Sequence, residues 1–255
     1  MPHLFHSTTT QSRYYAWFEA LHTRIDLLLL ASLSEQDFQT IEEAVRAELL
    51  AVEKMGNRFD PDSELSQAIH VATVRPVPIS QELYSLLDRC LRAHRETDGL
   101  FDITVNSPNF YPGLINGIEL TPFPDTPAGT LSLHRTSPPS LTGKATGRQA
   151  FILDLSGILK GYALERLRTL LPSLGIHDAL INLGNSSILS LGHNPSDIPP
   201  GHCLTTSGNA TPDRCHIRNP LTGEYITGQR QISVTTADAI DGEILATVTF
   251  IRTSL

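Results

Sequence analysis

The sequence contains no run of basic residues. Its 255 residues include 19 Lys and Arg against 27 Asp and Glu, which gives a formal net charge of −8 at pH 7. Nucleic-acid backbones are bound through clustered Lys and Arg side chains. The acidic balance therefore argues against a nucleic-acid-binding protein, although one local cationic or magnesium-lined pocket would be enough to hold a dinucleotide.

Cysteine is scarce as well. The three cysteines are Cys90, Cys203 and Cys215, and no two of them have CxxC spacing. An odd number without such a pair favours reduced thiols in a reducing compartment. Cys90 falls on the apolar face of an expected helix and should lie in the core, whereas Cys203 and Cys215 could pair across a short loop.

Long apolar runs are missing too. The stretch from Ile25 to Leu33 is largely apolar, but it is too short to cross a bilayer, which needs about 20 residues. The first residues also lack the basic start, apolar run and small-residue cleavage site of a signal peptide. We therefore expect no membrane span and a cytoplasmic location.

The residues that are present describe an ordinary globular chain, with 40% apolar and 18% charged residues and no internal repeat. Strands are predicted at residues 25–31, 150–155 and 179–183. Helices are predicted at residues 34–56, from residue 80 onward, and at residues 163–174. Residues 136–147 are expected to form a loop or hairpin, and residues 244–251 either a helix or a strand. Because helices and strands mix without strict alternation, we predict an α+β fold with mixed or antiparallel sheets flanked by helices.

Two Gly-containing segments follow the expected helices. Residues 56–65 resemble a loop that ends a helix, with Phe59 among turn-forming residues. In residues 99–104, Gly99 lets the backbone approach a ligand and Phe101 could stack on a flat ring. Taken alone, residues 56–65 favour a loop that merely ends a helix, and residues 99–104 are only weak evidence for a ligand site.

Residues 154–165 form a joint between an expected strand and a helix. Such a joint presents backbone amides and the positive end of a helix dipole to anions, and Lys160 adds a charge at the same place. The GxxxxGK spacing of a Walker A loop is absent. The segment is therefore either a pyrophosphate seat or an ordinary turn with a surface lysine. Farther along, Glu243 and Thr247 would share one face of a helix and could bind a hard cation through oxygen.

The order of these segments along one chain resembles the FAD:protein FMN transferase (ApbE) family. Its Met-Gly-Thr element is similar to Leu21-His22-Thr23, and its aromatic-Asp-x-x-Ser-Glu-Leu element to Phe59–Leu65. The other matching segments are Gly99–Thr104, Asp154–Ala163, Thr206–Gly208, His216–Gly223 and Glu243–Thr247. The resemblance runs from about Leu21 to Phe250. It implies a single domain over residues 1–255, built of two interleaved lobes and shortened at the C-terminus relative to the family.

The resemblance implies a function and a set of site residues. Members bind FAD and Mg²⁺, and many transfer FMN to a Ser or Thr hydroxyl of an acceptor protein with release of AMP. His216 would be the catalytic residue. The FAD-binding residues would be Leu21, Phe59, Leu100, Phe101, Asp102, Asp154, Lys160 and Ile217. The metal would be held by the backbone carbonyls of Gly157 and Ala246 and by the side chains of Glu243 and Thr247.

The sequence departs from the family pattern in three places. Glu243 stands for the usual metal-binding Asp, Asn219 for the Asp before Pro220, and residues 184–187 (Gly-Asn-Ser-Ser) for a common Gly-Gly-acidic stretch. Three functions are compatible with these residues: FMN transfer to a protein, hydrolysis of FAD to FMN and AMP, and non-catalytic FAD binding.

Overall fold

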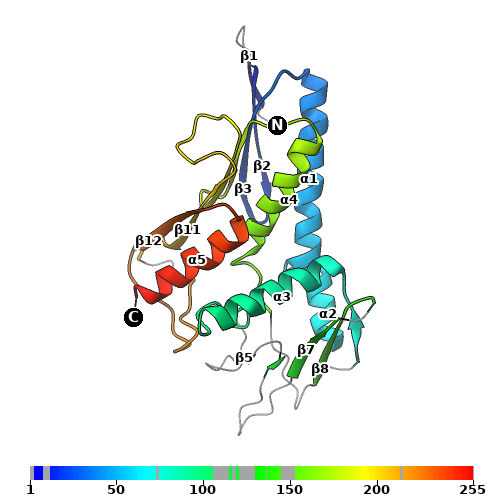
Figure 1. Ribbon diagram of the computed structural model, residues 1–255, viewed down its shortest axis with the longest axis vertical. Coiled ribbons are helices and arrows are strands. Elements are labelled where there is room, and N and C mark those ends of the chain that lie inside the picture. The colour runs from blue at the N-terminus through cyan, green and yellow to red at the C-terminus, as the bar shows by residue number, and fades with distance from the viewer. Residues whose placement is uncertain are drawn as a thin grey trace. The chain divides into compact units, whose positions relative to one another are not determined.

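A computed structural model gives the fold of the chain (Figure 1). The structure describes residues 3–7, 12–72, 75–105, 115–116, 119–120, 130–135, 137–144, 153–212 and 215–254. Their contacts divide the chain into two compact units that alternate along the sequence. Unit 1 comprises residues 1–53, 158–207 and 232–246, and unit 2 comprises residues 54–157, 208–231 and 247–255. The predicted α+β class with two interleaved lobes is therefore confirmed.

A seven-stranded sheet, in the order β1-β2-β3-β9-β10-β11-β12, is the largest sheet of the fold. Its strands are β1 (His3–Ser7), β2 (Ser12–Ala20), β3 (Thr23–Leu30), β9 (Ala179–Leu183), β10 (Ser187–Leu191), β11 (Cys203–Asn209) and β12 (Arg230–Thr236). Successive pairs from β1 to β11 are antiparallel. The strands predicted at residues 25–31 and 179–183 are confirmed as β3 and β9. They pair directly, with Leu27 opposite Ile181.

Short strands form the smaller sheets of unit 2. One sheet has the order β4-β8-β7, built of β4 (Val77–Pro78), β7 (Thr130–His134) and β8 (Ser140–Lys144). The other pairs β5 (Ile115–Asn116) with β6 (Glu119–Leu120). The antiparallel β7–β8 pair confirms a hairpin for the described part of residues 136–147, while residues 136 and 145–147 lie outside the described part.

The helices begin and end at the capping residues and the glycine that the sequence indicates. Helix α1 (Glu35–Gly56) begins with a capping box, because the Asp37 N–H donates to Ser34 Oγ at 3.1 Å and Ser34 donates to the Asp37 carboxylate. Helix α3 (Gln81–Glu96) has Ser80 as its N-cap. Helix α4 (Leu159–Ser173) is followed by Gly175, whose φ of +78° favours glycine. The remaining helices are α2 (Glu64–Ala72) and α5 (Ala239–Arg252).

The structure adds one helix to the predicted elements, contradicts one predicted strand and decides one open alternative. Helix α2 was not predicted, because the turn-forming residues before it resembled a longer loop. The strand predicted at residues 150–155 is wrong in its described part, since residues 153–155 are buried but form no strand, and residues 150–152 lie outside the described part. The alternative left open for residues 244–251 is decided in favour of helix α5. No helix among the described residues is long and apolar enough to cross a membrane.

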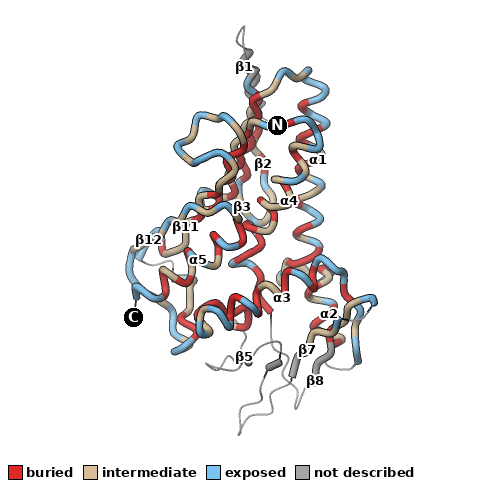
Figure 2. Tube along the Cα trace, in the orientation of Figure 1, coloured by how far each residue is buried: buried red, intermediate tan, exposed pale blue. Residues whose placement is uncertain are grey.

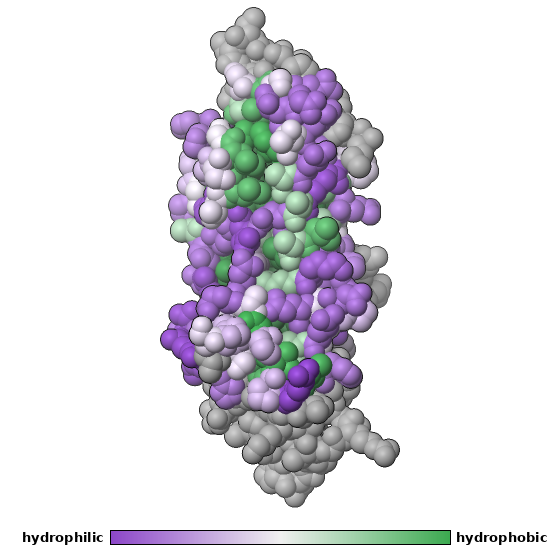
Figure 3. Space-filling view, turned by 90° about the vertical axis from the view of Figure 1, so that its right-hand side faces the viewer, coloured by the Kyte–Doolittle hydropathy of each residue, from purple (hydrophilic) through white to green (hydrophobic). Residues whose placement is uncertain are grey.

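Helices α1 and α4 cover one face of the large sheet within unit 1 (Figure 1). The Tyr14 ring on β2 stacks against Phe38 of α1, with 5.1 Å between ring centroids, and the Arg46 guanidinium of α1 lies over Phe18. Arg166 of α4 pairs with Glu48 of α1. Buried residues concentrate along the central strands and on the inner helix faces (Figure 2). Both hydrophilic and hydrophobic residues are visible on the face drawn in Figure 3.

Candidate functional site

Asp154 lies at the centre of a set of contacts in unit 2. Its N–H donates to the Ile103 carbonyl at 2.7 Å, and its Oδ1 accepts the N–H of Ser156 at 2.9 Å. Its Oδ2 lies 2.9 Å from Nε of Arg58. The Asp154 side chain is only 4% exposed, so the Arg58 guanidinium and the Ser156 N–H stabilise a charge that burial would otherwise penalise. These contacts join the predicted 99–104 segment to the start of the predicted 154–163 segment.

The 99–104 segment is held from inside unit 2. Asp102 Oδ1 accepts both the N–H and the hydroxyl of Thr104 at 2.7 Å, and Asp102 Oδ2 lies 3.9 Å from His94 Nδ1. Burial raises the pKa of Asp102, while the bonds from Thr104 and the charge of His94 oppose that shift. Leu100 and Phe101 are each 5% exposed, so both side chains lie in the core of unit 2.

Phe59 has the opposite environment. Phe59 is 63% exposed, and the Arg58 guanidinium lies 4.0 Å from its ring centroid. Arg58 thus contacts both the exposed ring and the buried Asp154 carboxylate. An aromatic ring that is largely exposed and has a cation over it is able to stack on a flat ligand.

His216 begins a short hairpin in unit 2. The Ile226 N–H donates to the Ile217 carbonyl at 2.9 Å, and Arg218 pairs with Tyr225 across the hairpin. The side chain of His216 is exposed and that of Ile217 is half-buried. Arg218 Nη1 donates to the Val105 carbonyl at 3.0 Å, which connects this hairpin to the residue directly after the 99–104 segment.

Asn219 keeps the turn of this hairpin although it replaces an Asp. Its Oδ1 accepts the N–H of Leu221 at 2.9 Å, and its side chain is buried. An Asp at this position could accept the same bond, because both side chains carry a suitably placed oxygen. The substitution is therefore conservative for the local structure.

Lys160 and Glu243 form a second set of contacts, in unit 1. Lys160 stands in the first turn of α4, and its Nζ donates to Ser186 Oγ. Glu243 of α5 is 4% exposed, and its Oε1 accepts the hydroxyl of Ser187 at 2.6 Å. Burial raises the pKa of Glu243, and the Lys160 charge together with the bonds from Ser187 and the Gly161 N–H oppose the rise.

Gly161 explains how α4 and α5 approach so closely. A Cβ added at this position would lie 2.6 Å from the Ala239 carbonyl oxygen and 2.7 Å from Glu243 Cγ. The helix also begins after Ile158, an N-cap residue whose side chain has no polar atom. The Glu243 carboxylate therefore accepts one of the N–H groups that the start of α4 leaves without an intrahelical partner.

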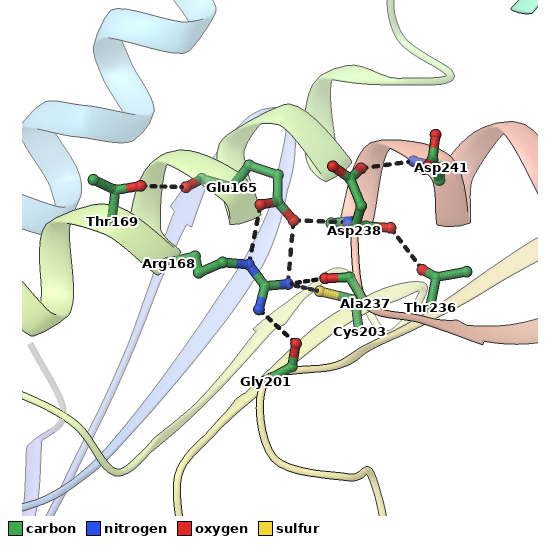
Figure 4. A network of polar contacts seen from close by, with 10 residues as sticks. Glu165, Arg168, Thr169, Gly201, Cys203, Thr236, Ala237, Asp238 and Asp241 are labelled. Atoms are coloured by element: carbon green, nitrogen blue, oxygen red, sulfur yellow. Dashed lines mark hydrogen bonds and ion pairs between the residues drawn. The ribbon is translucent and has the colours of Figure 1, made fainter.

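A network of polar contacts joins the same two helices farther from Glu243 (Figure 4). Glu165 Oε1 accepts the N–H of Ala239 at 2.7 Å, at the start of α5. Glu165 also pairs with Arg168, and Arg168 donates to the carbonyls of Gly201 and Ala237. The network thus holds the start of α5 against α4.

Leu21 lies in the turn between β2 and β3 in unit 1. Leu21 and His22 both have positive φ, of 51° and 56°. Gly184 faces this turn so closely that an added Cβ would lie 2.3 Å from Thr23 Oγ1. The Leu21 turn therefore packs against the turn that leads to Ser186 and Ser187.

The predicted metal ligands are drawn from both units. Glu243 and Ala246 belong to unit 1, and Gly157 and Thr247 belong to unit 2. Within the described part of the chain, no group of three or more His, Cys, Asp or Glu side chains could hold a metal ion. Magnesium does not require such a group, since it is commonly bound by one or two carboxylates together with other oxygens and phosphates. A carboxylate has about four lone-pair positions, so the bonds from Ser187 and Gly161 leave acceptor capacity on Glu243. The buried Glu243 carboxylate is therefore, in its chemistry, a suitable ligand for a hard divalent cation.

Several residues of these two sets were missed by sequence reasoning. Arg58, Arg218, Gly161 and Ser187 make the contacts that connect the predicted residues. A usable signal existed for Ser187. It lies in the stretch that departs from the Gly-Gly-acidic pattern, and its partner Glu243 is a departure too.

A family model described as the ApbE family matches residues 21–254. The chain belongs to the ApbE family. An ApbE relative from Klebsiella pneumoniae (strain 342), named FAD:protein FMN transferase, is 26% identical over 239 residues, which cover 80% of this chain and 68% of the relative. A protein of the same name from Chlamydia muridarum is 28% identical over 176 residues, and the match spans only about half of that relative, 52% of its length.

Solved structures of ApbE proteins share the fold. Flavin Transferase ApbE from Vibrio cholerae superimposes with a TM-score of 0.74 at 18% identity, over 94% of this chain and 87% of that one. The apo form of the Pseudomonas stutzeri flavinyl transferase ApbE gives 0.75 at 17% identity, over 97% and 88% of the two chains. The expected family and fold are thus confirmed.

Proposed function

We propose that this chain binds FAD and, with Mg²⁺, transfers the FMN moiety to a Ser or Thr hydroxyl of an acceptor protein, releasing AMP. Flavin transfer as the class of activity follows from the ApbE family and from the names of the relatives. The observation that carries the proposal is the connected set of contacts in unit 2. Arg58 contacts both the Phe59 ring and the Asp154 carboxylate, and the Asp154 N–H donates to the carbonyl of Ile103. Two residues farther along, the carbonyl of Val105 accepts a bond from Arg218, which lies next to Ile217 and close to His216 in the sequence.

FAD binding is assigned to surfaces that these contacts organise. Phe59 offers an exposed ring for stacking, and Leu100 and Phe101 support the segment that carries Asp102 from inside unit 2. In unit 1, Lys160 places a cation in the first turn of α4, where the helix dipole also favours anions. Leu21 and Ile217 complete the proposed FAD-binding set.

His216 is the proposed general base. The acceptor oxygen would form a bond to the FMN phosphorus while the bond to the bridging oxygen breaks, and AMP would leave with that oxygen. A Ser or Thr hydroxyl is a weak nucleophile, so a neutral imidazole that takes its proton would speed this step. The exposed side chain of His216 can meet a hydroxyl that arrives on another protein.

The metal is assigned to the carbonyls of Gly157 and Ala246 and the side chains of Glu243 and Thr247. Bound there, Mg²⁺ would offset negative charge on the pyrophosphate. The supporting feature is the placement of Glu243 and Thr247 four residues apart on α5, which puts both side chains on one face of the helix.

Incubation with FAD, MgCl₂ and a candidate acceptor tests the proposal, with intact mass of both proteins and AMP measured together. The candidate acceptor is a protein encoded by a neighbouring gene that carries a Ser- or Thr-containing flavinylation motif. Transfer adds one FMN to the acceptor for each AMP released. AMP release at the same rate without acceptor, and no mass gain, would identify FAD hydrolysis. FAD binding without AMP under any condition would identify a binding module.

A further inference from the structure

Two of the positions that depart from the family pattern touch each other. Ser187, in the changed stretch at residues 184–187, donates its hydroxyl to Oε1 of Glu243 at 2.6 Å. Ser187 is fully buried and Glu243 is 4% exposed, so water does not compete for this bond. The two residues are 56 positions apart in the sequence, and the fold brings them together through β10 and α5.

The surroundings fix where the Glu243 carboxylate can go. Gly161 leaves no room for a Cβ beside Glu243 Cγ, at 2.7 Å, so the side chain passes directly over the start of α4. The Gly161 N–H and the Lys160 charge then act on the carboxylate from α4, and Ser187 acts on it from β10. Lys160 is itself held through Ser186, the neighbour of Ser187.

An aspartate at position 243 would not make the same contact. Its side chain is shorter by one carbon–carbon bond, about 1.5 Å. The 2.6 Å contact with Ser187 would lengthen to about 4 Å, beyond hydrogen-bonding range. The hydroxyl at position 187 therefore matches a glutamate and does not match the aspartate of the family pattern.

We propose that Ser187 is a positioning residue that orients the Glu243 carboxylate toward the metal, so that the Glu243–Ser187 pair replaces a lone aspartate in this chain. The inference rests on the metal role assigned to Glu243 under the proposed function. Groups that orient a metal ligand typically change metal affinity by about 10–100-fold when they are removed. Ser187→Ala should therefore weaken metal binding although Ser187 itself is no ligand.

The test is a titration of the full chain with Mn²⁺ in the presence of FAD, followed by electron paramagnetic resonance of the free ion. Mn²⁺ takes the same oxygen ligands as Mg²⁺. The matched control is Ser190→Ala, because Ser190 is also fully buried on β10 but donates to the Ile198 carbonyl. We expect Ser187→Ala to weaken Mn²⁺ binding about tenfold, with unchanged FAD affinity, and Ser190→Ala to leave Mn²⁺ binding unchanged.

A double-mutant cycle separates positioning from a general loss of structure. Glu243→Asp should weaken Mn²⁺ binding, and adding Ser187→Ala to it should cost less than about twofold more, because the contact is already lost. Additive losses, or equal losses for Ser187→Ala and Ser190→Ala, would overturn the inference. Unchanged binding in Ser187→Ala together with loss in Glu243→Gln would overturn it while keeping the metal role. Full Mn²⁺ binding by Glu243→Gln would remove both the inference and the metal role.

Discussion

At the scale of single residues, His216 is the side chain on which the proposed chemistry depends most. His216→Ala should lower the single-turnover rate of AMP release about 10²–10⁴-fold, the usual contribution of a general base, and change FAD affinity little. His177 is also exposed and serves as the control, since His177→Ala should retain the full rate. If His216 only ordered its hairpin, the Ala variant would lose melting temperature and FAD affinity together and keep its single-turnover rate.

The two phenylalanines of the proposed FAD site should respond differently to truncation. Phe59→Ala removes an exposed ring and should weaken FAD binding about fivefold, which corresponds to about 1 kcal/mol of stacking, with little change in melting temperature. Phe101→Ala removes a buried ring and should lower the free energy of unfolding by about 3–5 kcal/mol. Calorimetric FAD titrations and thermal melts measure both. A stability loss for Phe59→Ala as large as that for Phe101→Ala would contradict this assignment.

The three cysteines should differ in reactivity. All three are free thiols, and burial raises the pKa of both Cys90 and Cys203 to about 12. A raised pKa keeps these thiols protonated and therefore unreactive at pH 8. Cys215 is only partly buried. Iodoacetamide at pH 8 should modify Cys215 alone in the native protein and all three cysteines after denaturation. Peptide mass mapping gives the answer, and rapid native labelling of Cys203 would contradict it.

At the scale of elements, the sequence predicts what is encoded locally. The capping box at Ser34, the N-cap at Ser80 and the glycine that ends α4 each act within a few residues, and each is found where it was predicted. The wrong strand at residues 153–155 has a tertiary cause. Its apolar residues are buried in the core, but the backbone N–H of Asp154 bonds to the 99–104 segment instead of a strand.

The candidate site, too, could be predicted where a feature lies within one segment and could not be predicted where it depends on contacts between distant residues. The ordered motifs identified the residues now proposed to bind FAD and metal, because each motif is a contiguous segment. The residues that connect them could not be predicted, because the contacts of Arg218 with Val105 and of Ser187 with Glu243 span 113 and 56 positions. No periodicity within one segment carries information about such distant pairs.

The packing of α4 on α5 leads to a prediction of its own. Replacing Gly by Ala inside a helix normally stabilises it by about 1 kcal/mol. At Gly161 the added Cβ would meet the Ala239 carbonyl at 2.6 Å, so we expect Gly161→Ala to destabilise the protein by about 1–3 kcal/mol. Chemical denaturation measures the change in the free energy of unfolding, and we expect a decrease. A more stable variant would show that α4 and α5 lie farther apart.

At the scale of the whole molecule, buried carboxyl groups shape the dependence of stability on pH. Burial raises the pKa of Asp102, so the folded state binds its proton more tightly than the unfolded state does. The resulting stabilisation is full below the ordinary carboxyl range and is lost as pH rises through the raised pKa. Asp102→Asn removes the titrating carboxyl group and with it this pH-dependent contribution to stability. The melting temperature of the variant relative to the unaltered chain should therefore be higher at pH 7.5 than at pH 4.5, and an identical difference at both pH values would contradict the prediction.

The alternation of the two units has a consequence for the synthesis of the chain. The chain passes from one unit to the other after residues 53, 157, 207, 231 and 246, so neither unit is a continuous piece. Translation proceeds at about 5–20 residues per second, and a domain made of one continuous piece can fold while later residues are still being added. The last stretch of unit 1, residues 232–246, is synthesised more than 200 residues after its apolar strand β3. We therefore expect the apolar side chains of β3 to stay without their unit 1 partners until the later stretches of that unit have been added.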